Sequence, residues 1–168
     1  MLIFLIGFMG TGKTHWGRIW SARYGMDFID LDDDIEAIEG QNITAIFKTS
    51  GETYFREKEA AALRRLASSN NTIIACGGGT PCFHDNIDWM NEHGLTIYLE
   101  TNPAVLSKRI STEIHQRPLV KDVPVEKLQA YIEALLQERI PFYQKAKHRF
   151  STEQLLNNSL DELLHRTD

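Results

Sequence analysis

Residues 7–14, which read GFMGTGKT, carry the clearest chemical pattern in the chain. Two glycines separated by four variable residues, then Lys13 and Thr14, are typical of a loop whose backbone N–H groups surround phosphates. The lysine can reach the terminal phosphates, and the threonine hydroxyl can bind Mg²⁺. An apolar run at residues 2–6 precedes the loop and a helical pattern follows it, as the motif requires. The alternative is a chance glycine-rich turn. The predicted contacts of a nucleoside triphosphate are Gly10, Thr11, Gly12, Lys13 and Thr14.

Two carboxylates close the next apolar run, where they can act beside those phosphates. Asp30 ends the run and Asp32 follows two residues later, so in an extended segment both side chains face the same side. One carboxylate can hold Mg²⁺ directly or through water, and the other can accept a proton from a hydroxyl group. We assign Asp33 and Asp34 instead to the acidic start of a helix.

Three arginines are candidates for binding anions, each with a simpler alternative. Arg56 and Glu59 are three residues apart on one helix face, as in an ordinary surface ion pair. Arg117 lies in a polar segment between two helices, at about residues 112–123, which is either a mobile lid that brings an arginine to phosphates or a surface loop. Arg139 lies on a helix and is either a ligand-binding arginine or a surface one.

The elements that must position these residues alternate between short apolar runs and helical stretches. We predict strands at residues 2–6, 28–31, 72–76, 95–100 and 148–152. We predict helices at residues 13–24, 33–38, 43–49, 52–67, 84–93, 103–111, 124–145 and 159–166. This alternation implies an α/β fold, a parallel five-stranded sheet with helices on both faces.

Ligands of such sheets bind at the carboxyl ends of the strands, so the segments that follow the first four strands should converge on one cleft. The third of these segments contains Gly77, Gly78 and Gly79. Three glycines after a buried strand let a ligand approach backbone N–H groups closely. A flexible turn is the alternative, but it does not explain why the glycines lie at the ligand-binding edge.

The bulk composition limits the class of protein. The 168 residues predict one domain, residues 1–168, and the net charge of −5 lacks the basic excess of a general nucleic-acid binder. No apolar run is long enough for a membrane span, and the first residues lack the charged start of a signal peptide. Cys76 and Cys82 have no metal-binding spacing, so we expect reduced thiols in a cytoplasmic protein.

Taken together, the segments GFMGTGKT, FIDLDDDIE, GETYFREKE, CGGGT, RPL and LLQERIPFY resemble the shikimate kinases in order and spacing, over about residues 2–150. These are small P-loop kinases of the nucleoside-monophosphate-kinase fold. The resemblance implies a three-layer P-loop fold with a mobile lid. It also implies Mg²⁺-dependent phosphorylation of shikimate by ATP, giving shikimate 3-phosphate on the route to chorismate and the aromatic amino acids. We expect a monomer that binds only these small molecules, with no nucleic-acid or membrane partner.

The resemblance also implies roles for residues on the nucleotide side. Lys13 and the loop amides hold the ATP phosphates, and Thr14 and Asp30 serve Mg²⁺. Arg109 matches an arginine beside the adenine, and Arg117 matches the lid arginine that contacts phosphate and substrate. The expected catalytic residues are Lys13, Asp32 and Arg117.

On the acceptor side, the resemblance implies that Asp32 contacts the shikimate hydroxyl that is phosphorylated, and that Arg56 and Arg139 bind the carboxylate. Two cleft arginines suit a small carboxylate, because a planar guanidinium can bind it bidentately. The other positions that match the acceptor pocket are Phe47, Phe55, Glu59, Gly78 and Gly79.

Two features depart from the family pattern. His15 stands where many members carry Ser or Thr, and residues 151–162 lack the proline often found in the adenine loop. Two alternative functions stay open: a related sugar-acid kinase such as gluconate kinase, and a nucleotide-binding regulatory module without catalysis.

Overall fold

The computed structural model describes residues 1–112 and 119–164. Five parallel strands form one sheet in the order β2-β3-β1-β4-β5. The strands are β1 (Leu2–Ile6), β2 (Asp27–Asp30), β3 (Thr72–Ala75), β4 (Leu95–Glu100) and β5 (His148–Ser151). Every residue of the central strand β1 is buried, because helices cover both faces of the sheet. The predicted five-stranded parallel sheet with helices on both faces is therefore confirmed.

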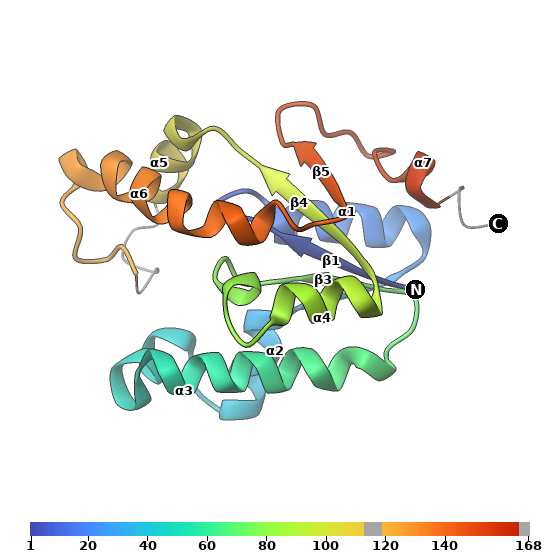
Figure 1. Ribbon diagram of the computed structural model, residues 1–168, viewed down its shortest axis with the longest axis horizontal. Coiled ribbons are helices and arrows are strands. Elements are labelled where there is room, and N and C mark those ends of the chain that lie inside the picture. The colour runs from blue at the N-terminus through green and yellow to red at the C-terminus, as the bar shows by residue number, and fades with distance from the viewer. Residues whose placement is uncertain (113–118, 165–168) are drawn as a thin grey trace.

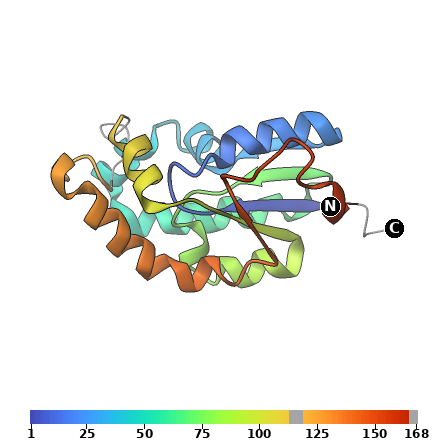
Figure 2. The same cartoon turned by 90° about the horizontal axis from the view of Figure 1, so that it is seen from above.

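The helices divide between the two faces of the sheet (Figures 1 and 2). They are α1 (Lys13–Tyr24), α2 (Leu31–Glu39), α3 (Ile43–Arg65), α4 (Asn86–His93), α5 (Pro103–Ser111), α6 (Val125–Tyr143) and α7 (Asp161–Leu164). Ile3 and Leu5 of β1 pack toward α1 and α7, whereas Phe4 and Ile6 pack toward α2 to α6. Figure 2 shows α1 on one side of the sheet and α4 and α6 on the other. Alternating side chains of one strand thus belong to two separate cores.

Two short segments, at Gly51 and at the start of α2, affect how the site is built. The helices predicted at 43–49 and 52–67 are confirmed as the two helical parts of α3, which meet at the non-helical Gly51 (φ 84°, ψ 172°). This backbone conformation is essentially restricted to glycine, so Gly51 allows the chain to change direction before the part of α3 that carries Arg56. Helix α2 begins at Leu31, two residues earlier than predicted.

Segments that follow four of the strands meet at the carboxyl edge of the sheet. The loops after β1, β2, β3 and β5 all contribute to one cavity there. The segment directly after β4, residues 101–105, does not line it, contrary to the prediction; helix α5 brings Arg109 and Thr112 to the cavity instead. None of the described helices is long and apolar enough to cross a membrane.

Candidate active site

The phosphate loop runs from the end of β1 into the first turn of α1, as its pattern predicts. Gly12 precedes the helix in the left-handed backbone region (φ 87°, ψ 23°), which glycine adopts without strain. The Nζ of Lys13 donates to the carbonyl oxygens of Gly7 and Phe8 at 2.8 and 2.9 Å. Backbone N–H groups, a helix N-terminus and an ammonium group therefore lie together, and this combination attracts polyphosphates.

Asp30 connects this loop to the end of β2. Its Oδ2 accepts a hydrogen bond from the Thr14 hydroxyl at 2.6 Å, and its Oδ1 accepts one from the backbone N–H of Asp32 at 3.1 Å. Asp30 is thus the cap of α2, which explains why the helix begins at Leu31 rather than at Asp33. The pair of oxygens from Thr14 and Asp30 is of the type that Mg²⁺ prefers.

Asp32 reaches the cavity from a helix and not from an extended segment. The expected reason for its placement is therefore wrong, because residues 31 and 32 already belong to α2. The Asp32 Oδ1 is out of contact with solvent and has no hydrogen-bond partner among the described residues. This buried carboxylate oxygen faces a cavity without a protein donor, which is costly unless a ligand supplies one.

The surroundings of Asp32 favour its neutral form. Burial is the main cause and raises the pKa of this carboxyl to about 7. The negative charges of Glu59 and Asp30 raise the pKa further, while Lys13 and Arg56 oppose the rise. Asp32 therefore titrates near neutral pH, which suits a group that accepts a proton during a reaction.

Arg56 and Glu59 form a buried ion pair, so the surface-pair alternative is wrong. Their side chains are 5% and 0% exposed, and Arg56 Nη1 donates to Glu59 Oε2 at 2.8 Å. The half-exposed Glu52 accepts from Arg56 Nε and Nη2 at 3.2 and 3.0 Å. Burial alone would lower the pKa of Arg56, but these carboxylates outweigh it and raise the pKa. The ring of Phe83 lies 4.4 Å from the Arg56 guanidinium carbon, so the guanidinium is held from several directions.

Arg139 is not a surface arginine either. It lies on α6, is 6% exposed, and its guanidinium carbon lies 5.5 Å from the centre of the Phe8 ring. Its Nη1 is buried without a hydrogen-bond partner among the described residues. A buried guanidinium nitrogen without a partner is a suitable site for an anion.

The three glycines after β3 make room for these side chains. A Cβ added at Gly79 would lie 2.5 Å from Arg56 Nη2, and one at Gly78 would lie 3.2 Å from Arg139 Nη1. None of the three glycines has a positive φ. Gly78 and Gly79 thus allow close packing against the two arginines, and Gly77 allows it against Asp32 and Glu59. The approach of a ligand to the backbone N–H groups stays a prediction.

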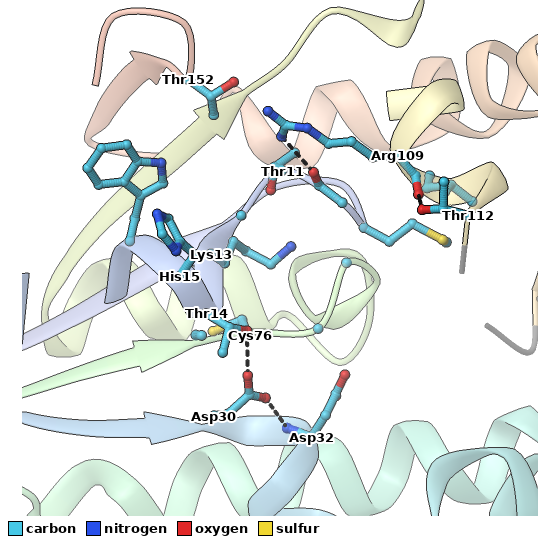
Figure 3. A pocket seen from close by; sticks show the side chains of 18 residues that line it. Thr11, Lys13, Thr14, His15, Asp30, Asp32, Cys76, Arg109, Thr112 and Thr152 are labelled. Atoms are coloured by element: carbon cyan, nitrogen blue, oxygen red, sulfur yellow. Dashed lines mark hydrogen bonds between the residues drawn. The ribbon is translucent and has the colours of Figure 1, made fainter. Parts of the chain in front are cut away.

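Two adjoining cavities contain the predicted residues that the structure describes, and Figure 3 shows the larger of the two. The larger has a volume of about 630 Å³, and all the described residues predicted to contact nucleotide or metal line it: Gly10, Thr11, Gly12, Lys13, Thr14, Asp30 and Arg109. The smaller has a volume of about 140 Å³, and all eight predicted acceptor residues line it: Asp32, Phe47, Phe55, Arg56, Glu59, Gly78, Gly79 and Arg139. Arg117 lies outside the described residues, as does part of the expected lid. The cavities meet at Met9, Asp32, Gly77 and Gly78, which line both.

Three residues that the sequence analysis did not single out support this arrangement. The Thr80 hydroxyl donates to Glu59 Oε1 at 2.6 Å, and the Tyr143 hydroxyl donates to the Gly78 carbonyl oxygen at 2.6 Å. Leu119, at the described end of the expected lid, lines the smaller cavity. Tyr143 lies one helical turn after Arg139, and this spacing was the signal available in the sequence.

A phosphate loop at the carboxyl edge of a parallel five-stranded sheet, with a small acceptor cavity beside it, defines the class of P-loop kinases. The family described as Shikimate kinase matches residues 9–167. A shikimate kinase of Phocaeicola vulgatus is 42% identical over 153 residues, which are 91% of this chain and 87% of that protein. The chain belongs to the shikimate kinase family, whose members transfer phosphate from ATP to shikimate.

Solved structures agree with this assignment. The shikimate kinase of Bacteroides thetaiotaomicron superposes with a TM-score of 0.91 at 36% identity, over 98% of each chain. The Acinetobacter baumannii shikimate kinase in complex with shikimate superposes with a TM-score of 0.86 at 31% identity, over 98% of this chain and 90% of that one. A Sinorhizobium meliloti gluconokinase has a TM-score of 0.55 at 20% identity and covers 99% of this chain and 97% of that one, so it shares the fold alone.

Proposed function

We propose that the larger cavity binds ATP, that the smaller binds shikimate, and that phosphate passes between them at Asp32. The observation that carries this proposal is the pair of unpartnered buried atoms in the smaller cavity, Asp32 Oδ1 and Arg139 Nη1. One is an acceptor for a hydroxyl and the other is a donor for a carboxylate. A ligand that satisfies both carries a hydroxyl and a carboxylate on one small frame, as shikimate does.

Arg56 and Arg139 are assigned to the shikimate carboxylate. Arg56 is already oriented by Glu59 and Glu52, so it can bind an anion without losing side-chain freedom at that moment. Gly78 and Gly79 lie beside the ring of the substrate. Phe47 and Phe55, whose ring centres are 4.9 Å apart, supply an apolar wall.

The phosphates of ATP are assigned to the loop amides, to Lys13 and to the N-terminus of α1. Thr14 and Asp30 would hold Mg²⁺, and their two oxygens suit a metal that keeps several water and phosphate ligands. No group of three or more metal-binding side chains is found within the described residues, which agrees with a metal held mainly by the nucleotide. When bound, Mg²⁺ neutralises phosphate charge. Arg109, which donates to the Gly10 carbonyl oxygen at 2.9 Å, lies beside the adenine.

The reaction follows from this arrangement. Asp32 accepts a hydrogen bond from the shikimate hydroxyl and takes its proton as the hydroxyl oxygen forms a bond to the γ-phosphorus. The bond between that phosphorus and the oxygen bridging to the β-phosphate breaks, and ADP leaves. Lys13 stabilises the charge on the phosphates. The resemblance assigns the same task to Arg117. We expect Arg117→Ala to lower kcat more than it lowers the affinity for ATP.

We also propose that the enzyme is a cytoplasmic monomer. The described residues assigned above to ATP, Mg²⁺ and shikimate adjoin one another within one fold, which supports a site that works in a single copy. Cys76 and Cys82 are unpaired, which suits a reducing compartment. If the protein eluted from a size-exclusion column at the volume of a dimer, at the concentration of the assay, the proposal of a monomer would be wrong.

A coupled ADP-release assay with shikimate, gluconate and nucleoside monophosphates side by side tests the function. Of these acceptors, we expect only shikimate to support release of ADP. Gluconate lacks the ring that fills the smaller cavity, and a nucleotide would need a base pocket there. Equal turnover of gluconate would favour the sugar-acid kinase, and no turnover with any acceptor would favour a non-catalytic module.

A further inference from the structure

The larger cavity has a second end, away from the acceptor, that the resemblance explains only through Arg109. The end shared with the smaller cavity contains Asp32 and Gly78, so the transferred phosphate must lie there. Figure 3 shows Arg109 and Thr152 on the opposite side of Lys13 from Asp30 and Asp32. The nucleoside part of ATP must therefore extend toward this second end. This direction of ATP rests on the proposed function.

Among the described residues that line that cavity is the large aromatic side chain of Trp16, on the first turn of α1. Its Cδ1 lies 3.6 Å from the position of a Cβ added at Gly12, so the indole stands directly beside the phosphate loop. One neighbour is the fully buried Trp20, at 5.5 Å between ring centres and 31° between planes. The indole is thus fixed against the core but stays partly exposed at the cavity.

The surrounding residues keep this end of the cavity in place. His15 lies edge-on to Trp16, with ring centres 5.5 Å apart and planes at 78°. Thr152 is held by a backbone hydrogen bond of 2.9 Å to Glu100 and by a hydroxyl contact of 2.7 Å with Thr101. Arg109 is tied to the phosphate loop through the Gly10 carbonyl oxygen. A flat apolar group entering here meets an indole held by the core and a guanidinium held by the loop.

We propose that Trp16 is the aromatic contact of the nucleobase and that it sets the preference of this enzyme for a purine nucleotide. A base gains free energy from stacking on an aromatic side chain, and a purine offers a larger ring surface than a pyrimidine. Of residues 151–162, Thr152 alone lines the larger cavity, so the apolar side chain beside it there is Trp16 of α1.

Intrinsic fluorescence tests the proposal without any substitution. Of the three tryptophans, Trp20 is fully buried, and Trp89 packs against Phe4 on the other face of the sheet. With excitation beyond the absorption of adenine, ADP should change the tryptophan emission, whereas inorganic tripolyphosphate, which has no base, should change it little. Trp89→Phe should keep the ADP response and Trp16→Phe should lose it. Equal responses to ADP and tripolyphosphate would overturn the proposal.

Affinity and selectivity give the second test. Trp16→Ala should raise the ADP dissociation constant roughly 5- to 150-fold, the usual span for loss of base stacking. Trp16→Phe should keep ADP affinity within about threefold of the parent, because a phenyl ring still stacks. The shikimate KM should not change in either variant, and the preference for ATP over CTP should fall in Trp16→Ala. If Trp16→Ala binds ADP as the parent does and keeps its preference, the proposal is wrong even though shikimate-dependent turnover, and with it the proposed function, stands.

Discussion

Asp32 and Arg139 are informative because each presents a buried polar atom that the protein itself does not satisfy. A carboxylate oxygen and a guanidinium nitrogen could have paired with each other or with neighbours, yet each faces the smaller cavity instead. Leaving such groups unpaired costs stability, roughly 1–3 kcal/mol for each group. That cost is typical of a site whose partners arrive with the ligand.

The role of Asp32 predicts the effect of replacing its carboxylate by an amide. Asp32→Asn should lower kcat by roughly 10²- to 10⁴-fold, the usual span for loss of a general base. ADP affinity should stay close to that of the parent, because the phosphate loop is a separate element. Steady-state kinetics and ADP titration measure both quantities. Asp34→Asn is the control, because Asp34 pairs with Arg65 instead of lining either cavity. Normal kcat in Asp32→Asn, or a loss in Asp34→Asn, would show that the wrong carboxylate has been chosen.

The role of Arg139 predicts a change in affinity for one substrate only. Arg139→Ala should raise the shikimate KM roughly 30- to 150-fold, because it removes a charge-assisted bond of about 2–3 kcal/mol. The ATP KM should change little. Arg149→Ala is a matched control, since Arg149 is exposed and pairs with Glu100 at the end of the sheet. An unchanged shikimate KM in Arg139→Ala would refute the assignment of this arginine to the carboxylate.

Among the elements, the loop after β3 lies between both arginines and both cavities. Tyr143 of α6 holds the Gly78 carbonyl oxygen, and the Thr80 hydroxyl holds Glu59, which in turn holds Arg56. The loop therefore connects α6 and α3 at the smaller cavity, and a shift of either helix would move the residues that line it. A larger side chain in this loop should displace the guanidinium groups of Arg56 and Arg139 without disturbing the rest of the fold.

Gly79→Ala tests this arrangement. Gly79 has an ordinary backbone conformation (φ −92°, ψ −14°), so alanine causes no backbone strain there. Its methyl group would lie 2.5 Å from Arg56 Nη2 and must displace the guanidinium. We expect the shikimate KM to rise at least about tenfold, the equivalent of roughly 1.4 kcal/mol, while the ATP KM and the far-ultraviolet circular dichroism stay normal. A proportional rise of both KM values would point to general damage to the site.

The sequence predicted the sheet and most helices because the apolar runs and the glycine and proline positions are local signals. It misplaced the start of α2 because a single side chain, Asp30, both ends the strand and caps the helix. It left a surface position open as the alternative for Arg56 and Arg139 because charged residues are rarely buried, and only tertiary packing brings Gly79 to Arg56 and Gly78 to Arg139. Residues that act through hydrogen bonds across the fold, such as Thr80, carry no local signal at all.

At the scale of the whole molecule, an acidic protein of net charge −5 holds two anionic substrates. It does so because positive groups gather at one edge of the sheet, with carboxylates interleaved between them. The carboxylates set the positions of the arginines, but they also repel one another inside the cavity. Asp32 is both buried and repelled by neighbouring carboxylates, and its pKa is raised as a result.

Because burial and repulsion disfavour the charged form of Asp32, we predict that the folded protein becomes more stable when Asp32 loses its charge. A folded pKa of about 7, above the unfolded value of roughly 3.9, contributes stability that is complete below about pH 4 and is lost as the pH rises through 7. The free energy of unfolding of Asp32→Asn, measured relative to the parent by urea titration, should therefore rise between about pH 5 and pH 8, by roughly 2–3 kcal/mol. Any cost of burying the amide itself is independent of pH and cancels in this comparison. A difference that stays constant with pH would mean that Asp32 is ionised as easily in the folded protein as in the unfolded chain, and the carboxylate would then be a weaker base for the hydroxyl than its surroundings indicate.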